Sequence, residues 1–292
     1  MTAEDKMSTL VEKMTPRILT ASGYCFQPLN ALDNLKSRIE ILGRRHLLRG
    51  TILVSSEGIN CTVAGAEPSV KMFQSEVNLL LGRPIPDFRE SYADALPFKR
   101  FLVKIKKEII TMGVALSEQS LANDASHYIE PKDLAARLRR GDKIMLLDTR
   151  NDYEVGVGTF IGAKDYNIES FTRFAENVDT HLSELEGAEI VTFCTGGIRC
   201  EKVARFMADK IPSSKIYQIR GGILNYFREC GGEHWQGDCF VFDERVAVTP
   251  ALKPSGHRFC ADCGNPVMPP VTHCRECISP EFSSPVVDQS PA

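Results

Sequence analysis

The stretch from Ile190 to Glu201 reads I-V-T-F-C-T-G-G-I-R-C-E and organises the chain around it. A short apolar run of strand character leads to Cys194, a glycine pair follows, and helical periodicity begins near Arg199. This order predicts a thiol at the junction between a strand and a helix. Backbone N–H groups and the positive helix end favour a negative sulfur there, so we expect a lowered pKa for Cys194. Arg199 adds a permanent positive charge at the rim of the loop.

The spacing Cys-x4-Arg from Cys194 to Arg199 resembles the active-site loop of rhodanese-like domains, whose cysteine carries a persulfide. The loop of the related phosphatases is one residue longer, so phosphatase activity is disfavoured. The alternative is a buried, inert cysteine, which is common for free Cys, but a glycine pair and an arginine suit an anion-binding loop better. The predicted loop consists of Cys194, Thr195, Gly196, Gly197, Ile198, Arg199 and Cys200.

Neighbouring segments extend the resemblance to an α/β domain over residues 127–232. The apolar stretch from Ile144 to Thr149 is typical of a central parallel strand, and Asp148 and Arg150 at its end are predicted supporting residues. Residues 146–155, 158–168 and 216–226 follow the order of the rhodanese segments. We therefore expect a parallel sheet with Cys194 at its carboxyl edge.

The sequence of residues 17–115 predicts a ferredoxin-like, or acylphosphatase-like, α+β domain. The apolar patterns give a β-α-β-β-α-β order, which matches the split βαβ plan. Strands are expected at 18–26, 48–55, 61–64, 87–91 and 100–110, and helices at 29–42 and 68–81. Residues 1–16 are expected to be a flexible lead, and residues 113–124 a linker.

Basic residues are concentrated in this N-terminal part. Residues 16–115 hold 14 Lys or Arg and 9 Asp or Glu, a balance of +5, whereas the whole chain has a net charge of -3. Such an asymmetry favours an anionic partner, although short basic runs often mark only solvated ends of helices and strands. The candidate phosphate contacts are Arg44, Arg45, Arg49, Lys99, Arg100, Lys104, Lys106 and Lys107.

Two CxxC pairs stand in the C-terminal part, Cys260 with Cys263 and Cys274 with Cys277. This pattern predicts one tetrahedral Zn²⁺ in a small ribbon-like segment within residues 233–280, and four thiolates leave no open position for a substrate. An iron site or an unoccupied ribbon are the alternatives. The alternating stretch from Cys239 to Val248 predicts an extra strand, and the Ser- and Pro-rich residues 281–292 predict a disordered tail.

Composition points to a soluble protein of the cytoplasm. No run reaches the roughly 20 apolar residues of a membrane span, and the N-terminus lacks the apolar core of a signal peptide. The ten cysteines of the 292-residue chain then favour metal binding and catalysis over disulfides.

Three stretches together resemble one family. They are L-R-G-T-I-L-V-S-S-E-G-I-N-C-T-V-A-G, C-T-G-G-I-R-C-E-K, and W-Q-G-D-C-F-V-F-D-E-R-V-A-V. They resemble the TrhO family, the rhodanese-domain tRNA uridine(34) hydroxylases of UPF0176 type. The resemblance implies a tRNA partner and oxygen-dependent 5-hydroxylation of the wobble uridine, with O₂ as co-substrate.

Two other functions remain open on the residues themselves. A thiosulfate-type sulfurtransferase would use Cys194 to carry a persulfide to another acceptor, and a zinc-containing RNA or protein adaptor would need no catalysis. An intact Cys194 argues against the adaptor. Cys200 either packs the helix after the loop against the sheet or resolves an oxidised Cys194.

Overall fold

The computed structural model describes residues 18–86, 88–93, 95–122, 127–243, 245–274 and 277. The chain divides into two compact units, residues 1–124 and residues 125–292, and each is described by itself. Among the helices in these described ranges, none is both long and apolar enough to cross a membrane.

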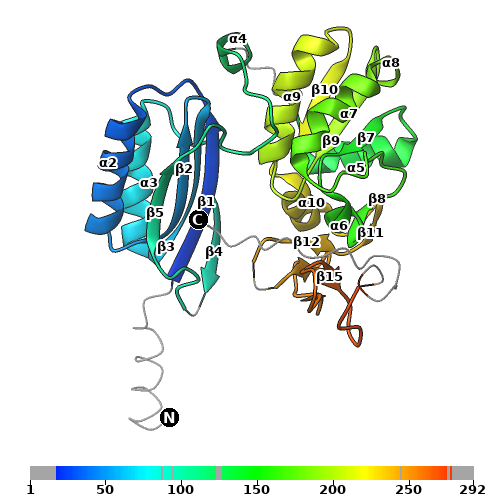
Figure 1. The fold of residues 1–292 in the computed structure, drawn as a ribbon. Coiled ribbons are helices and arrows are strands. Elements are labelled where there is room, and N and C mark those ends of the chain that lie inside the picture. Colours follow the sequence, from blue (N-terminus) through cyan, green and yellow to red (C-terminus); the bar gives the residue numbers. More distant parts are fainter. Residues whose placement is uncertain are drawn as a thin grey trace. The chain divides into compact units, whose positions relative to one another are not determined.

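The N-terminal unit is a five-stranded sheet with two helices on one face (Figure 1). The strand order is β4-β1-β3-β2-β5; β5 runs parallel to β2, and the other neighbours are antiparallel. The β-α-β-β-α-β order of the ferredoxin-like plan is confirmed. The elements are β1 (Ile18–Phe26), α2 (Leu32–Arg45), β2 (Arg49–Ser55), β3 (Gly58–Ala66), α3 (Glu67–Leu81), β4 (Arg89–Ala93) and β5 (Phe101–Ile105).

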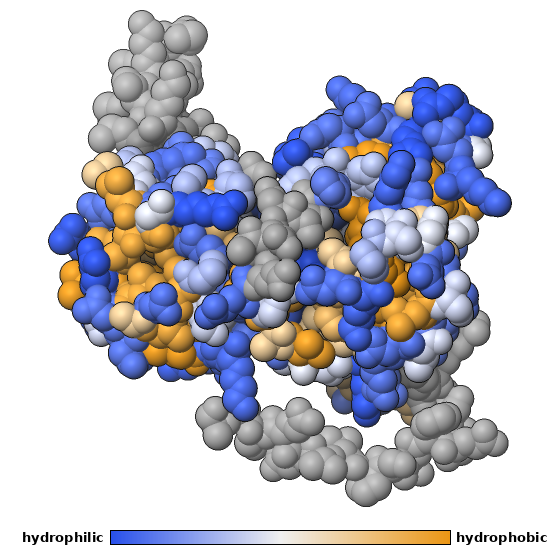
Figure 2. Space-filling view, turned by 90° about the horizontal axis from the view of Figure 1, so that it is seen from above, coloured by the Kyte–Doolittle hydropathy of each residue, from blue (hydrophilic) through white to orange (hydrophobic). Residues whose placement is uncertain are grey.

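Alternation along β1 builds the core of this unit. Every second residue of the strand is buried up to Cys25, so one side of the sheet packs on the helices. Leu19 of β1 belongs to the same buried cluster as Ile39 of α2 and Phe73 of α3. Apolar side chains also reach the visible surface of this unit (Figure 2).

Several predicted boundaries in this unit are wrong by a few residues. The strand predicted at 100–110 ends at Ile105, because its pairing partner β2 ends beside it. The first helix begins at Leu32 instead of Leu29, after Ala31 adopts a left-handed conformation with φ 50°. Part of the predicted linker forms the helix α4 (Glu118–Ala122).

The C-terminal unit is built on a parallel sheet with the order β6-β10-β9-β7. This confirms the predicted parallel α/β architecture. The sheet and its helices are β6 (His127–Ile129), α5 (Pro131–Arg140), β7 (Met145–Asp148), α6 (Asp152–Val155), η1 (Phe171–Arg173), α7 (Phe174–Thr180), α8 (Leu182–Leu185), β9 (Glu189–Phe193), α9 (Ile198–Lys210), β10 (Lys215–Ile219) and α10 (Gly222–Cys230).

Short antiparallel pairs complete the unit. The predicted single strand from Cys239 to Val248 is wrong, because this stretch turns back and pairs with itself. Trp235 packs edge-to-face on Phe160 and Phe227, with ring centroids 5.0 and 5.2 Å away, and thereby holds the segment after α10 to the core. The pairs are β8 (Gly158–Phe160) with β11 (Trp235–Gly237), β12 (Cys239–Phe240) with β13 (Ala247–Val248), and β14 (Arg258–Phe259) with β15 (Pro266–Val267).

Candidate active site and metal site

The loop between β9 and α9 presents Cys194 at the carboxyl end of the parallel sheet, as the sequence predicts. Gly197 caps the helix with φ 98°, a left-handed conformation that suits glycine. Its N–H donates to the Cys194 sulfur over 3.0 Å. The sulfur therefore lies at the N-terminal end of a 13-residue helix, where N–H groups stabilise a negative charge.

The pKa of Cys194 is held well below its usual value although the residue is only 1% exposed. Burial by itself raises the pKa of this thiol. Hydrogen bonds from the thiol and the backbone N–H of Cys200, the charge of Arg199 and the N–H of Gly197 outweigh it. The arrangement thus favours the thiolate, the form in which sulfur acts as a nucleophile.

The start of α10 holds the other side of the loop. Ile223 and Leu224 donate their backbone N–H groups to the carbonyl oxygens of Cys194 and Thr195, over 3.0 and 3.3 Å. A Cβ atom on Gly222 would lie 2.6 Å from the Cys194 oxygen, so only glycine allows this approach. The glycine pair Gly221 and Gly222 therefore lets the start of α10 hold the backbone of the Cys194 loop in place.

Arg199 is buried instead of lying at the rim of the loop, which corrects the expectation from the sequence. It is 6% exposed and makes a bidentate ion pair with Glu154, with N–O distances of 2.5 and 2.7 Å. Glu154 is fully buried and also accepts the backbone N–H of Asn151 over 3.1 Å. The negative charge of Glu154 offsets the positive charge of Arg199. Cys194 therefore lies beside an ion pair and not beside an isolated guanidinium group.

Glu154 is a site residue that the sequence reasoning missed. Its spacing after Asn151 is a capping-box signal, which explains a local role but not the contact with Arg199, 45 residues away. The predicted supporting residues form a second buried pair. Arg150 binds Asp148 over 2.6 Å and donates to the Gly158 carbonyl over 2.7 Å, which ties the end of β7 to β8.

Cys200 lies in the first turn of α9, and its sulfur is 3.6 Å from the Thr149 hydroxyl oxygen. The thiol of Cys200 is one of the groups that lower the pKa of Cys194. Burial, and then the neighbouring Cys194 sulfur, raise the pKa of Cys200, so it remains a thiol and can donate a proton. Since it is also 1% exposed, packing and a supporting role are both compatible with its position.

The eight candidate phosphate contacts are exposed, but they lie in three places. They are the end of α2 (Arg44 and Arg45), the start of β2 and β5 (Arg49, Lys99 and Arg100), and the far end of β5 (Lys104, Lys106 and Lys107). Arg49 begins β2, and it donates to the Lys99 carbonyl over 2.6 Å just before β5. Lys106 and Lys107 follow the far end of β5, about 17 Å along the strand. Arg44 and Arg45 pair with Glu40 and Glu76, which reduces their net charge.

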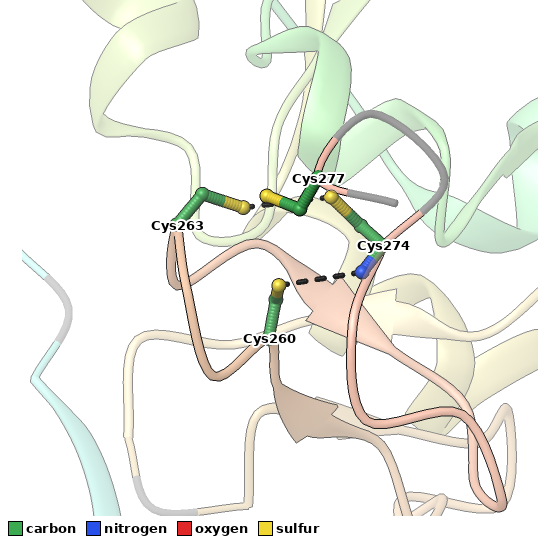
Figure 3. Close-up of side chains that lie close together, drawn as sticks. All are labelled: Cys260, Cys263, Cys274 and Cys277. Carbon is green, nitrogen blue, oxygen red and sulfur yellow. Dashed lines mark hydrogen bonds between the residues drawn. The ribbon is translucent and has the colours of Figure 1, made fainter. Parts of the chain in front are cut away.

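The four predicted metal ligands come together. The sulfur atoms of Cys260, Cys263, Cys274 and Cys277 all lie within 4.8 Å of one another, and Figure 3 shows the side chains converging. A tetrahedral Zn²⁺ with Zn–S bonds of 2.3 Å requires sulfur atoms about 3.8 Å apart, so this set fits a metal ion.

The backbone around the first pair is already shaped for a metal ion. The N–H groups of Cys263 and Cys274 lower the pKa of Cys260 to about 6, which favours the thiolate that a metal requires. Gly264, with φ 76°, donates its N–H to the Cys260 carbonyl over 3.1 Å and closes the tight turn.

Comparisons with known proteins find a family model and solved structures that match parts of the chain. A family model described as the UPF0176 acylphosphatase like domain matches residues 18–109. Among solved structures, the rhodanese-like domain of an Anabaena protein has 19% identity and a TM-score of 0.32, covering 38% of this chain and 78% of that chain. An acylphosphatase from Bacillus subtilis has 11% identity and a TM-score of 0.25, covering 30% and 98%.

Curated relatives match most of the chain. A protein from Cupriavidus taiwanensis is 40% identical over 258 residues, which cover 87% of this chain and 90% of the relative. One from Burkholderia ambifaria is 41% identical over 261 residues, which cover 86% and 91%. Both relatives carry the name tRNA uridine(34) hydroxylase. On this identity and coverage, the chain belongs to the tRNA uridine(34) hydroxylase family.

Proposed function

We propose that this protein hydroxylates C5 of the wobble uridine of tRNA, with Cys194 as its nucleophile. The observation that carries the proposal is the thiolate loop within a chain that matches named hydroxylases over 87% of its length. Replacing C5–H by C5–OH with O₂ as oxidant takes up two electrons and two protons from a reductant, and the second oxygen atom leaves as water.

The residues around Cys194 have distinct roles in this proposal. Arg199 and the N–H groups of Gly197 and Cys200 keep the sulfur ionised. Glu154 fixes the guanidinium of Arg199, and the Asp148–Arg150 pair holds the end of β7 beneath the loop. The exposed basic residues beside β2 and β5 contact tRNA phosphates.

Nucleoside mass spectrometry of tRNA tests the proposed function. Cells that lack this protein are expected to lose 5-hydroxyuridine and its derivatives, and a plasmid carrying the intact chain is expected to restore them. A sulfurtransferase acting on other acceptors gives the opposite result, with unchanged 5-hydroxyuridine and lost transfer of sulfur from thiosulfate. Unchanged tRNA in the deletion strain therefore overturns the proposal.

We propose that the ion at the four-cysteine site is Zn²⁺ and that its role is structural. Cys260, Cys263, Cys274 and Cys277 would supply all four ligands, so the ion would hold together the segment around β14 and β15 and would take no part in the reaction. A ligand set made only of thiolates favours zinc over harder cations such as magnesium.

Elemental analysis of protein purified without chelators is expected to find about one zinc per chain. Cys263→Ser should reduce the zinc content to a small fraction and lower the Tm, because metal binding is linked to local folding. Cys230→Ser is the matched control, since Cys230 lies on α10 outside the cluster and should leave the zinc content unchanged. Metal-free protein from such a preparation would contradict the assignment.

A further inference from the structure

Phe242 is an exposed aromatic residue directly beside the catalytic loop. Its relative exposure is 68%, and it follows β12 in the turn that leads to β13. Backbone pairing continues past β12 and β13, because the Val241 N–H donates to the Val246 carbonyl over 2.9 Å. Arg245 and Asp243 add a bidentate ion pair of 2.9 and 2.6 Å. The ring therefore directly follows a stretch held by backbone pairing and yet remains open to solvent.

Two contacts tie this ring to the active-site loop. The Arg199 guanidinium carbon lies over the Phe242 ring, 5.7 Å from its centroid. Phe240 packs edge-to-face against Phe242 with centroids 5.0 Å apart, and the Phe240 carbonyl accepts the Thr195 hydroxyl over 3.2 Å. One side of the ring thus rests on the arginine that neighbours Cys194, while much of its surface faces solvent.

Single exposed apolar residues are common on protein surfaces and need no explanation by themselves. Phe242 differs because its ring lies against Arg199, the arginine whose charge acts on Cys194. An exposed aromatic ring backed by a guanidinium group is an arrangement on which unpaired nucleobases can stack, since every base has a flat π-face.

We propose that Phe242 is a stacking platform for an unpaired base of the substrate RNA, and that it positions the anticodon loop over Cys194. This inference rests on the proposed function and adds to it the residue that receives the base. The recognition is by shape and stacking, so it fixes where the loop sits without reading a base edge.

The test measures binding and turnover of an anticodon stem-loop RNA by the full-length protein. Phe242→Leu is expected to weaken binding by about tenfold, because base–aromatic stacking contributes on this scale. Phe242→Tyr keeps a ring and should bind normally. Phe259→Leu is the matched control, because Phe259 is 51% exposed on β14 and lies outside the catalytic loop.

A series of stem-loops, each with an abasic residue at one loop position, locates the stacked base. At one position the abasic RNA should bind the intact protein and Phe242→Leu equally, because the stacking partner is already missing. If every abasic RNA still shows the full loss with Phe242→Leu, or if Phe242→Leu binds the intact RNA normally, the stacking proposal is overturned.

Fluorescence of Phe242→Trp separates this inference from the proposed function. Trp235, which is 7% exposed and the only natural tryptophan, gives a buried reference signal. RNA should quench the new tryptophan through stacking whether or not turnover occurs. Quenching without 5-hydroxyuridine formation would support the stacking site and refute the hydroxylase activity. Formation of 5-hydroxyuridine without quenching would support the hydroxylase activity and refute the stacking site.

Discussion

Cys194→Ser is expected to abolish the formation of 5-hydroxyuridine while the protein keeps its fold. A serine hydroxyl does not ionise near neutral pH, so the loop loses the proposed nucleophile and the rate should fall roughly a thousandfold or more. The loop itself should persist, because its shape depends on backbone bonds such as those from Ile223 and Leu224. Mass spectrometry of tRNA treated with each protein, together with thermal unfolding, measures both effects. A fully active Cys194→Ser protein would remove the nucleophile from the proposal.

Cys200→Ala is the informative comparison for this variant. It removes a thiol that lowers the pKa of Cys194 but leaves the Cys194 sulfur in place. A stable Cys200→Ala protein with full turnover rules out a resolving role, whereas a stable but inactive one shows that Cys200 does more than pack α9 against the sheet.

The thiolate can also be followed directly by its ultraviolet absorbance. Because the folded-state pKa of Cys194 is lowered, the thiolate signal should persist as the pH falls below the ordinary thiol pKa, and disappear only when the pH falls through the lowered value. The difference between the intact protein and Cys194→Ser isolates this residue. Absence of that difference at neutral pH would mean that Cys194 is protonated there.

The sequence predicted the parts of the site that lie close together in the chain. Cys194, the two glycines and the start of α9 are a local strand–turn–helix pattern, so their geometry follows from nearby residues. The convergence of the four cysteines was also predictable, because two CxxC pairs can close around one ion only in a few ways.

The contacts that join distant segments were not predictable in this way. Glu154 reaches Arg199 across 45 positions, and Phe240 reaches Thr195 across another 45. Alternation of apolar residues from Cys239 to Val248 indicated a strand but could not show that the chain turns back near Asp243. Such pairings depend on tertiary packing, which periodicity alone does not encode.

Glu154→Gln is expected to cause the largest loss of stability among the single substitutions considered for this site. Burial by itself lowers the pKa of Arg199, but the charge and hydrogen bonds of Glu154 more than compensate, so the guanidinium stays charged inside the protein. Glutamine keeps the shape of the side chain and removes the charge. Breaking a buried ion pair in this way typically costs about 3–5 kcal/mol, because the remaining charge is left without its partner. Chemical denaturation of the two proteins measures the difference.

The exposed pair of Arg173 and Glu176 provides the matched control. Its N–O distance is 3.2 Å and both side chains are 69% exposed, so Glu176→Gln should change the free energy of unfolding by less than about 1 kcal/mol. The double variant Glu154→Gln with Arg199→Met then separates charge from shape. Removing both charges should recover much of the stability lost in Glu154→Gln. The double variant should nevertheless have little activity, because the thiolate then lacks the guanidinium beside it. If Glu154→Gln unfolds no more easily than Glu176→Gln, the buried pair does not support the fold, and its place beside Cys194 would have to be explained by catalysis alone.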